Sequence, residues 1–182
     1  MNGFLSVFKR EFKSYFATPV AYVFLVIFLA AAPFLAFQNG AFFKMGQANM
    51  QSFFQFIPML FVFMVPSTAM RMWAEERNSG SIELLFTLPI TVGQAVLGKF
   101  MAAWAFLTIA LLLTFPFPIA VASLGNPDWG LIITGYLGSF LLAGSFLAIG
   151  SFFSAISKNQ VVSFILTVVA LGILLRLGMP TT

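Results

Sequence analysis

Residues Pro19–Phe37 read PVAYVFLVIFLAAAPFLAF, a run of nineteen positions without a charged side chain. The hydrocarbon core of a bilayer is about 30 Å thick, and about 20 apolar residues cross it as a helix. This run therefore predicts a transmembrane helix. Four more runs of this kind follow, at about 52–70, 100–122, 130–153 and 161–175. The chain is predicted to be all-α, a polytopic transmembrane helix bundle of about five spans forming one membrane domain over residues 1–182.

The first run also has the features of a secretory signal. Lys9, Arg10 and Lys13 precede an apolar core, as basic residues do in such signals. This alternative is disfavoured, because Pro33 would directly follow the cleavage site and the apolar run continues to Phe37.

The composition agrees with a membrane protein. Hydrophobic residues make up 60% of the chain and charged residues only 8%, whereas soluble domains carry about 25% charged residues. The formal net charge of +4 comes from scattered Lys and Arg residues without a basic stripe, which argues against nucleic-acid binding. The chain has no Cys and no His, so the commonest metal ligands and the usual general base are missing. We therefore expect no metal site, no catalytic residues and no enzymatic activity.

The distribution of Lys and Arg predicts the orientation in the membrane, because these residues gather on the cytoplasmic side. With the N-terminus inside, the inner segments hold Lys9, Arg10, Lys13, Arg71, Arg77, Lys99 and Lys158, and the outer segments hold Lys44 and Arg176. This bias predicts a cytoplasmic N-terminus, and we expect a multi-pass protein of the bacterial inner membrane.

The segment before the first span, residues 1–16, mixes aromatic and basic side chains. Phe4, Leu5, Phe8 and Phe12 share one face of a helix. Such a helix lies in the plane of the inner leaflet, with its apolar face in the lipid. We therefore predict an amphipathic interfacial helix; the alternative is a disordered leader.

The interiors of the spans hold proline and small residues but no Asp, Glu, Lys or Arg. Ion-coupled carriers usually place ionisable groups there, so their absence argues against a proton-driven carrier. Pro116 and Pro118 are expected to bend or end the third span near its outer face.

Small residues recur at four-residue spacing in the fourth span, a pattern that lets helix backbones approach closely. They are Gly135, Ser139 and Ala143 in one row, and Gly144 and Ala148 in another. We expect these helix-packing residues to act within one chain rather than in a dimer.

The loop between the second and third predicted spans holds three of the five acidic residues of the chain. Asn78–Gly80 is predicted to end one short helix and to cap the next. Glu83 then lies in the first turn of that next helix, and Pro89 stops it. The apolar face of this helix either docks on a partner or lies flat on the membrane.

Residues 75–89 of this loop read EERNSGSIELLFTLP and are followed by Gly98-Lys99. The loop resembles the first cytoplasmic loop of type-2 ATP-binding-cassette (ABC) permeases, an exporter family. Residues 70–76, 125–130, 135–138 and 158–160 resemble the subgroup of gliding-motility and multicopper-enzyme-maturation permeases. The resemblance implies that a coupling helix in residues 75–89 sits in a groove of a cytoplasmic ATPase. The implied ATPase-coupling residues are Glu75, Glu76, Arg77, Gly80, Ser81, Ile82, Glu83, Leu84, Leu85, Thr87 and Pro89.

The resemblance also implies partners. A separate ATPase subunit binds ATP and Mg²⁺, so this chain binds no cofactor directly. A second permease chain, identical or related, completes the pathway in the lipid bilayer. Family members usually have six spans with both termini inside, whereas this sequence predicts five. We expect that the chain lacks the sixth span through truncation, rather than being a shortened variant.

Residues 93–100 read GQAVLGKF and nearly match a phosphate-binding loop. The motif requires Ser or Thr after the lysine to hold Mg²⁺, but Phe100 stands there, and no strand precedes the stretch. We therefore predict that ATP is bound by another chain, and that Lys99 anchors the third span at the inner interface.

Three functions are compatible with the residues. The loop favours a permease subunit that moves a substrate, in the export direction, using ATP hydrolysed on a partner. A non-transporting membrane scaffold or assembly factor is the alternative. An ion-coupled carrier or channel is disfavoured by the uncharged spans.

Overall fold

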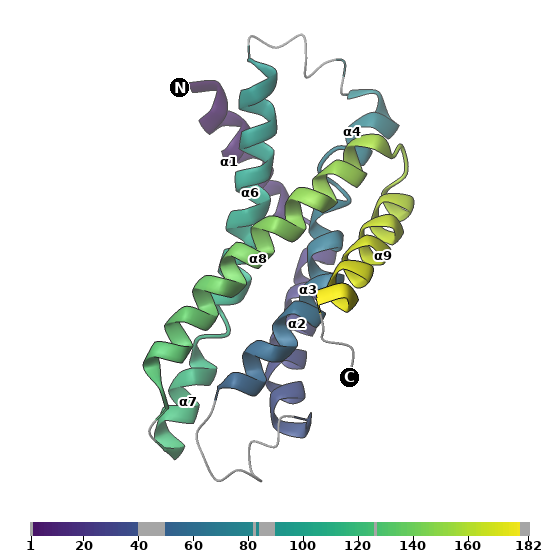
Figure 1. Ribbon diagram of the computed structural model, residues 1–182. Coiled ribbons are helices and arrows are strands. Elements are labelled where there is room, and N and C mark those ends of the chain that lie inside the picture. The colour runs from purple at the N-terminus through teal and green to yellow at the C-terminus, as the bar shows by residue number, and fades with distance from the viewer. Residues whose placement is uncertain (1, 40–49, 82, 84–89, 126, 179–182) are drawn as a thin grey trace.

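A computed structural model describes residues 2–39, 50–81, 83, 90–125 and 127–178. In these residues the secondary structure is helical (Figure 1). The helices are α1 (Asn2–Ala17), α2 (Pro19–Asn39), α3 (Gln51–Ala69), α4 (Ala74–Ser79), α6 (Val92–Leu112), α7 (Pro116–Leu124), α8 (Trp129–Ile156) and α9 (Gln160–Gly178). Within this described part, five helical stretches are long and apolar enough to cross a membrane. The predicted all-α bundle with five spans is confirmed.

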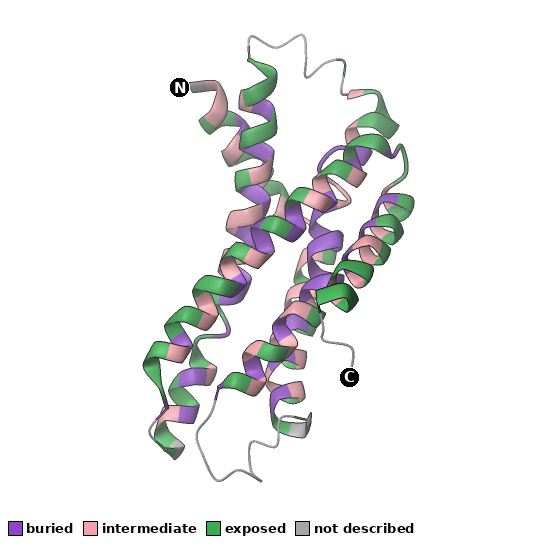
Figure 2. Ribbon diagram, in the orientation of Figure 1, coloured by how far each residue is buried: buried purple, intermediate pink, exposed green. Residues whose placement is uncertain are grey.

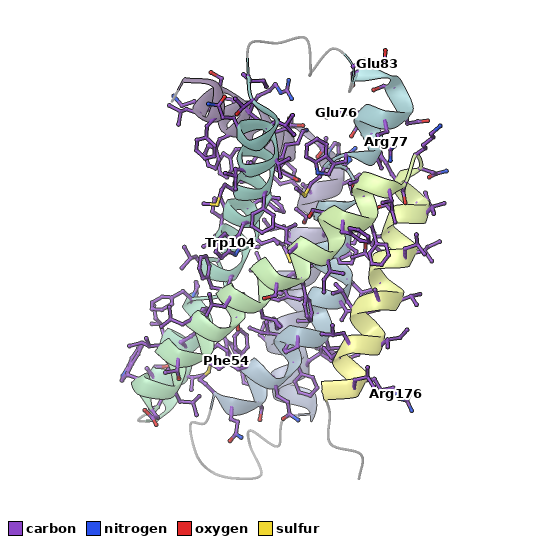
Figure 3. The ribbon with its side chains drawn as sticks, turned by 45° about the horizontal axis from the view of Figure 1, so that its top comes forward. Phe54, Glu76, Arg77, Glu83, Trp104 and Arg176 are labelled. Atoms are coloured by element: carbon purple, nitrogen blue, oxygen red, sulfur yellow. The ribbon has the colours of Figure 1, made fainter. Side chains whose placement is uncertain are left out.

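The bundle has two distinct ends (Figure 1). The loop end holds α1, α4, the start of α6 and the connection between α8 and α9. The far end holds α7, the start of α3 and the start of α8. The seven basic residues predicted to lie inside all belong to segments of the loop end, and Arg176 lies toward the other end (Figure 3). Lys44 lies outside the described residues.

Helix α3 occupies the centre and packs against α2, α8 and α9. Every fourth residue of α3, from Phe53 through Ile57, Phe61 and Val65 to Ala69, is at most 1% exposed. The buried residues of α9 also recur at this spacing, at Ser163, Thr167 and Leu171. The outer sides of α8 and α9 carry exposed apolar residues (Figure 2). Such a surface suits contact with lipid, because the hydrocarbon core is itself apolar.

The third span begins earlier than the hydropathy predicts. Helix α6 starts at Val92 rather than at Phe100, because Thr91 and Gln94 form a capping box that nucleates a turn there. The other boundary is as expected: α6 ends at Leu112 and α7 begins at Pro116. Proline fits the first turn of a helix, where its missing N–H costs no bond. The predicted break of the third span at the prolines is confirmed.

The segment before the first span is helical, so the disordered leader is wrong for residues 2–17. The prediction placed the apolar face of α1 in the lipid, and Leu5 of that face is 49% exposed, whereas Val7 is 5% exposed and packs on protein. Val7 lies against Gly98 of α6. A Cβ added to Gly98 would stand 2.9 Å from Cγ1 of Val7. The extended α6 offers α1 a protein surface that the sequence pattern did not indicate.

The small residues of α8 lie at contacts with neighbouring helices. A Cβ on Gly135 would stand 2.6 Å from the ring of Phe54 in α3, and one on Gly144 would stand 3.0 Å from Trp104 in α6. Trp104 uses this space to stack on the ring of Phe140, with centroids 4.4 Å apart. Ser139 and Ala143 are buried on the same side.

Ala148 is the exception among the predicted packing residues, because it is exposed on the outer surface of the chain. Four residues turn a helix by more than one full turn, so the row that starts at Gly144 rotates away from the bundle.

Candidate functional site

Helix α4 is a short helix, Ala74–Ser79, whose charges suit its dipole. Glu75 and Glu76 lie in the first turn and Arg77 in the last turn, which is the favourable order of charges along a helix. The helix ends at Gly80, whose φ of 72° is in the left-handed region that glycine adopts without strain. The predicted helix end at Asn78–Gly80 is confirmed.

The start of α4 is capped by a residue from another helix. The side chain of Trp73, at the N-cap position, makes no capping bond. Instead, the buried hydroxyl of Ser154 in α8 accepts hydrogen bonds from the backbone N–H of Trp73 at 3.1 Å and of Ala74 at 3.2 Å. The same Oγ donates to the carbonyl oxygen of Met70 at 3.2 Å. Sequence reasoning missed Ser154, because nothing near it in the chain points to this partner.

Arg77 makes the second bond between these two helices. Its guanidinium donates to the carbonyl oxygen of Ala155, in the last turn of α8. Carbonyl groups of the last turn have no partner inside their own helix, so a basic side chain is a favourable cap there. Figure 3 shows Arg77 beside the end of α8.

A compact ion-pair cluster joins α4 to α1 and α6. The ammonium group of Lys99 lies 2.8 Å from Glu76 Oε1 and 3.1 Å from Glu11 Oε1. Arg10 lies 2.7 Å from Glu11 and 3.5 Å from Glu76. The Lys99 side chain is 2% exposed, and Nζ also lies 5.3 Å from the centre of the Trp73 ring. A charge so deeply buried requires partners of opposite charge, and the two glutamates provide them.

A cavity of about 410 Å³ lies beside this cluster, between α1 and the loop that holds α4. Arg71 and Glu75 line it and form an ion pair at 3.8 Å. Tyr15 lines its α1 side and donates a hydrogen bond to the Thr68 carbonyl oxygen at 3.3 Å. Burial, followed by the charge of Glu11, raises the pKa of Tyr15 well above its usual range, so the phenol stays protonated.

The sequence as a whole matches one known family. The sequence profile of the ABC-2 family transporter proteins matches residues 5–181. The chain belongs to this ABC-2 family. Members of this family are membrane permease subunits of ABC transporters, which work in the lipid bilayer with an ATPase partner. No curated protein and no solved structure matches the chain significantly.

The ABC-2 permease brings together some of the residues that the sequence singled out. Glu75, Glu76 and Arg77 lie on α4, and Gly80 ends it. Beyond Gly80, Ser81 Oγ lies 2.8 Å from Ser79 Oγ, and the exposed Glu83 donates from its backbone N–H to the Gly80 carbonyl oxygen at 3.4 Å. The remaining predicted coupling residues lie outside the described residues: Ile82, Leu84, Leu85, Thr87 and Pro89.

Lys99 of the permease, which the sequence predicts to anchor the third span at the inner interface, is buried in protein, with its side chain 2% exposed. The stretch from Gly93 to Lys99 lies inside α6, so its backbone N–H groups are part of a helix rather than of a phosphate-binding loop. Lys99 itself is covered by α1 and neutralised by Glu11 and Glu76. Its position at the apolar edge of a span hides this role, because the acidic partners are far away in the sequence.

Proposed function

We propose that this ABC-2 permease exports a substrate across the bacterial inner membrane, driven by ATP hydrolysis on a separate cytoplasmic ATPase. We propose further that residues 75–89 receive the mechanical force from that ATPase. The observation that supports this is the fixation of α4. The Lys99 cluster joins α4 to α1 and α6, and Ser154 joins it to α8. The segment after Gly80 therefore extends from a base that is attached to three other helices.

The charges at the loop end support the orientation. The basic residues of α1, of the segment after α3, of α6 and of the α8–α9 connection share the loop end. Cytoplasmic segments carry the excess of Lys and Arg. In the proposed orientation the N-terminus and residues 75–89 face the cytoplasm, where ATP is available.

The proposed complex contains a second permease chain, identical or related, and a pair of ATPase subunits. ATP and Mg²⁺ are held by the ATPase subunits, and this permease binds neither directly. Closure of the ATPase pair on ATP displaces the segment after Gly80. Rigid-body movement of packed helices then carries the displacement to the far end, which gives alternating access.

Orientation is tested first. The chain has no cysteine, so Ser81→Cys introduces a single thiol in the segment after Gly80, which is called the coupling segment below. In sealed inside-out vesicles, a membrane-impermeant maleimide is expected to label it quickly, and in intact cells it is expected not to. Labelling from the outside of intact cells would contradict the proposal.

Docking is tested by reversing an exposed charge of the coupling segment. Glu83→Lys is expected to lower the amount of ATPase that is purified with the permease about tenfold. Lys158→Glu also changes an exposed charge at the loop end, but in the connection between α8 and α9, and is expected to leave the ATPase bound. Equal binding by both variants would favour a non-transporting scaffold. Substrate flux in liposomes without any ATPase would favour an ion-coupled carrier.

A further inference from the structure

One hydroxyl group holds the corner between α3 and α4. Met70 lies at the end of α3, and Trp73 and Ala74 begin α4. The Oγ of Ser154 bonds to all three residues, accepting from two N–H groups and donating to one carbonyl. The Ser154 residue is 0% exposed, so water does not compete for these bonds.

Arg77 and Ser154 together make the contact reciprocal. Ser154, from the last turn of α8, caps the N-terminus of α4, and Arg77, from the last turn of α4, caps the C-terminus of α8. The N-terminus of one helix and the C-terminus of the other carry partial charges of opposite sign. Each helix therefore supplies the group that the end of the other lacks.

Helices α4 and α8 are separated in the chain by α6 and α7, so no short stretch of backbone connects them. The bonds of Ser154 and Arg77 connect them instead. Between α3 and α8 themselves the contact is largely apolar packing, with a Cβ on Gly150 falling 2.6 Å from Ala69 Cβ. Packed helices can slide past one another in shear movements. Hydrogen bonds depend on distance and direction, and so they fix the register of α8 on the α3–α4 corner.

The two spans that are joined in this way also line a shallow, widely open depression of about 620 Å³ at the far end of the bundle, called here the far-end cavity. Gln55 and Phe54 of α3 line it on one side, and Thr134 and Gly135 of α8 line it on the other. Figure 3 shows Phe54 at the end opposite to Glu76 and Arg77. A displacement that reaches both spans reaches both walls of this cavity.

We propose that Ser154 is a positioning residue that, with Arg77, transmits displacement of the coupling segment to α8, so that α3 and α8 reshape the far-end cavity together. The inference rests on the proposed function, because it assumes that an ATPase moves the segment after Gly80. In a chain without the Ser154 hydroxyl, the displacement still reaches α3 through the backbone, but less of it reaches α8, because only the bond from Arg77 to Ala155 remains.

The test follows two single-cysteine reporters in the permease–ATPase complex in membranes. Ser81→Cys reports on the coupling segment, and Thr134→Cys reports on the far-end cavity. The rate of maleimide labelling is measured without nucleotide and with ATP plus vanadate, which arrests the ATPase. With Ser154 present, both labelling rates are expected to change severalfold on addition of nucleotide.

Ser154→Ala is then added to each reporter. The change at position 81 is expected to remain, and the change at position 134 is expected to fall at least fivefold. Ser154→Thr keeps the hydroxyl and is expected to restore the change at position 134. Ser151→Ala is the matched control, because Ser151 lies in the same region of α8 and its hydroxyl bonds to the Ala148 carbonyl of its own helix.

The outcomes separate the two proposals. An unaltered nucleotide response at position 134 in Ser154→Ala would overturn the role of Ser154 while leaving the proposed function standing. The absence of any response at position 81 in the chain with Ser154 would overturn the proposed function itself. If Ser154→Ala does not accumulate in the membrane, Arg77→Gln removes the other half of the joint. That variant must weaken the response at position 134, and an unaltered response would overturn the inference.

Discussion

At the loop end of the permease the helices are joined by charged and hydrogen-bonding side chains, whereas at the far end they meet mainly through aromatic rings. Lys99 binds Glu76 at 2.8 Å at the loop end. At the far end the rings of Phe53 and Phe117 are stacked at 5.1 Å, and Phe54 meets Tyr136 edge-on at 5.3 Å. Ionic and hydrogen bonds fix distance and direction, but ring contacts tolerate small shifts. The loop end is therefore suited to move as one body, and the far end is suited to change shape.

The largest effect is expected from removal of the charge at the centre of the loop end. Lys99→Met removes the buried cation and leaves Glu11 and Glu76, which are partly buried, with only the more exposed Arg10 beside them. Breaking one partner of a buried ion pair costs about 3–5 kcal/mol. The expected result is a large drop in the melting temperature of the purified permease.

The control for this variant is Lys9→Met, which removes an exposed charge from α1 and is expected to have little effect, because exposed ion pairs contribute at most about 1 kcal/mol. Similar melting temperatures for the two variants would show that the buried cluster is not what stabilises the loop end.

The next largest effect is expected from added methyl groups where α8 packs closely on α3, at one position toward each end. An added methyl at Gly150 meets Ala69 Cβ at 2.6 Å, an atom fixed to the backbone, whereas one at Gly135 meets the Phe54 ring, which can rotate. Gly150→Ala is therefore expected to destabilise by about 1–3 kcal/mol, as overpacking does. Gly135→Ala is expected to cost less.

Gly138→Ala is the control for both variants, because a Cβ there meets no atom within 4 Å. Unfolding with increasing sodium dodecyl sulfate ranks the three variants. An order in which Gly135→Ala is the most harmful would contradict the idea that the far end is the more adaptable one.

What the sequence could predict depends on how far apart in the chain the contributing residues lie. The spans, α1 and the break before Pro116 follow from hydropathy, periodicity and proline geometry, which are properties of neighbouring residues. Family membership followed from the motif in residues 75–89, which is also local. A single sequence is sufficient for both, because the residues that carry each signal lie close together in the chain.

The bonds that fix the loop end could not be predicted in this way. Lys99 looked like an interface anchor because it precedes an apolar run, and its partner Glu76 is 23 positions away. Ser154 lies 81 positions from Trp73 and stands among other small residues of α8. One sequence does not indicate which of several serines will meet the end of a distant helix.

A smaller effect is expected from a single hydrogen bond at the far end. The hydroxyls of Tyr136 and Thr114 lie 2.9 Å apart and join α8 to the segment between α6 and α7. Tyr136→Phe removes the bond and keeps the ring. It is expected to lower the free energy of unfolding by about 1 kcal/mol, the usual net value of one neutral bond. Thr114→Val removes this bond and also the one that Thr114 Oγ1 donates to the Leu111 carbonyl oxygen, so the bond to Tyr136 is the cause if adding Tyr136→Phe to Thr114→Val costs nothing further.

The smallest effect at neutral pH is expected from the matching change at the loop end. Tyr15→Phe removes a hydrogen bond of 3.3 Å to the Thr68 carbonyl oxygen. The bond is longer than that of Tyr136, so the expected cost is about 0.5 kcal/mol, at the low end of the range for such bonds. Equal costs at Tyr15 and Tyr136 would mean that one such bond contributes alike at both ends.

The effect of the Tyr15 variant is expected to depend on pH. Below a pH of about 10 the phenol is protonated in both the folded and the unfolded chain. Because burial raises the pKa of Tyr15 in the folded chain, the unfolded chain loses this proton first as the pH rises. The folded state then loses up to about 1.4 kcal/mol per pH unit, and the phenylalanine variant escapes this loss. Melting temperatures should therefore converge and cross above about pH 10; parallel curves would show that the phenol is not buried between α1 and α3.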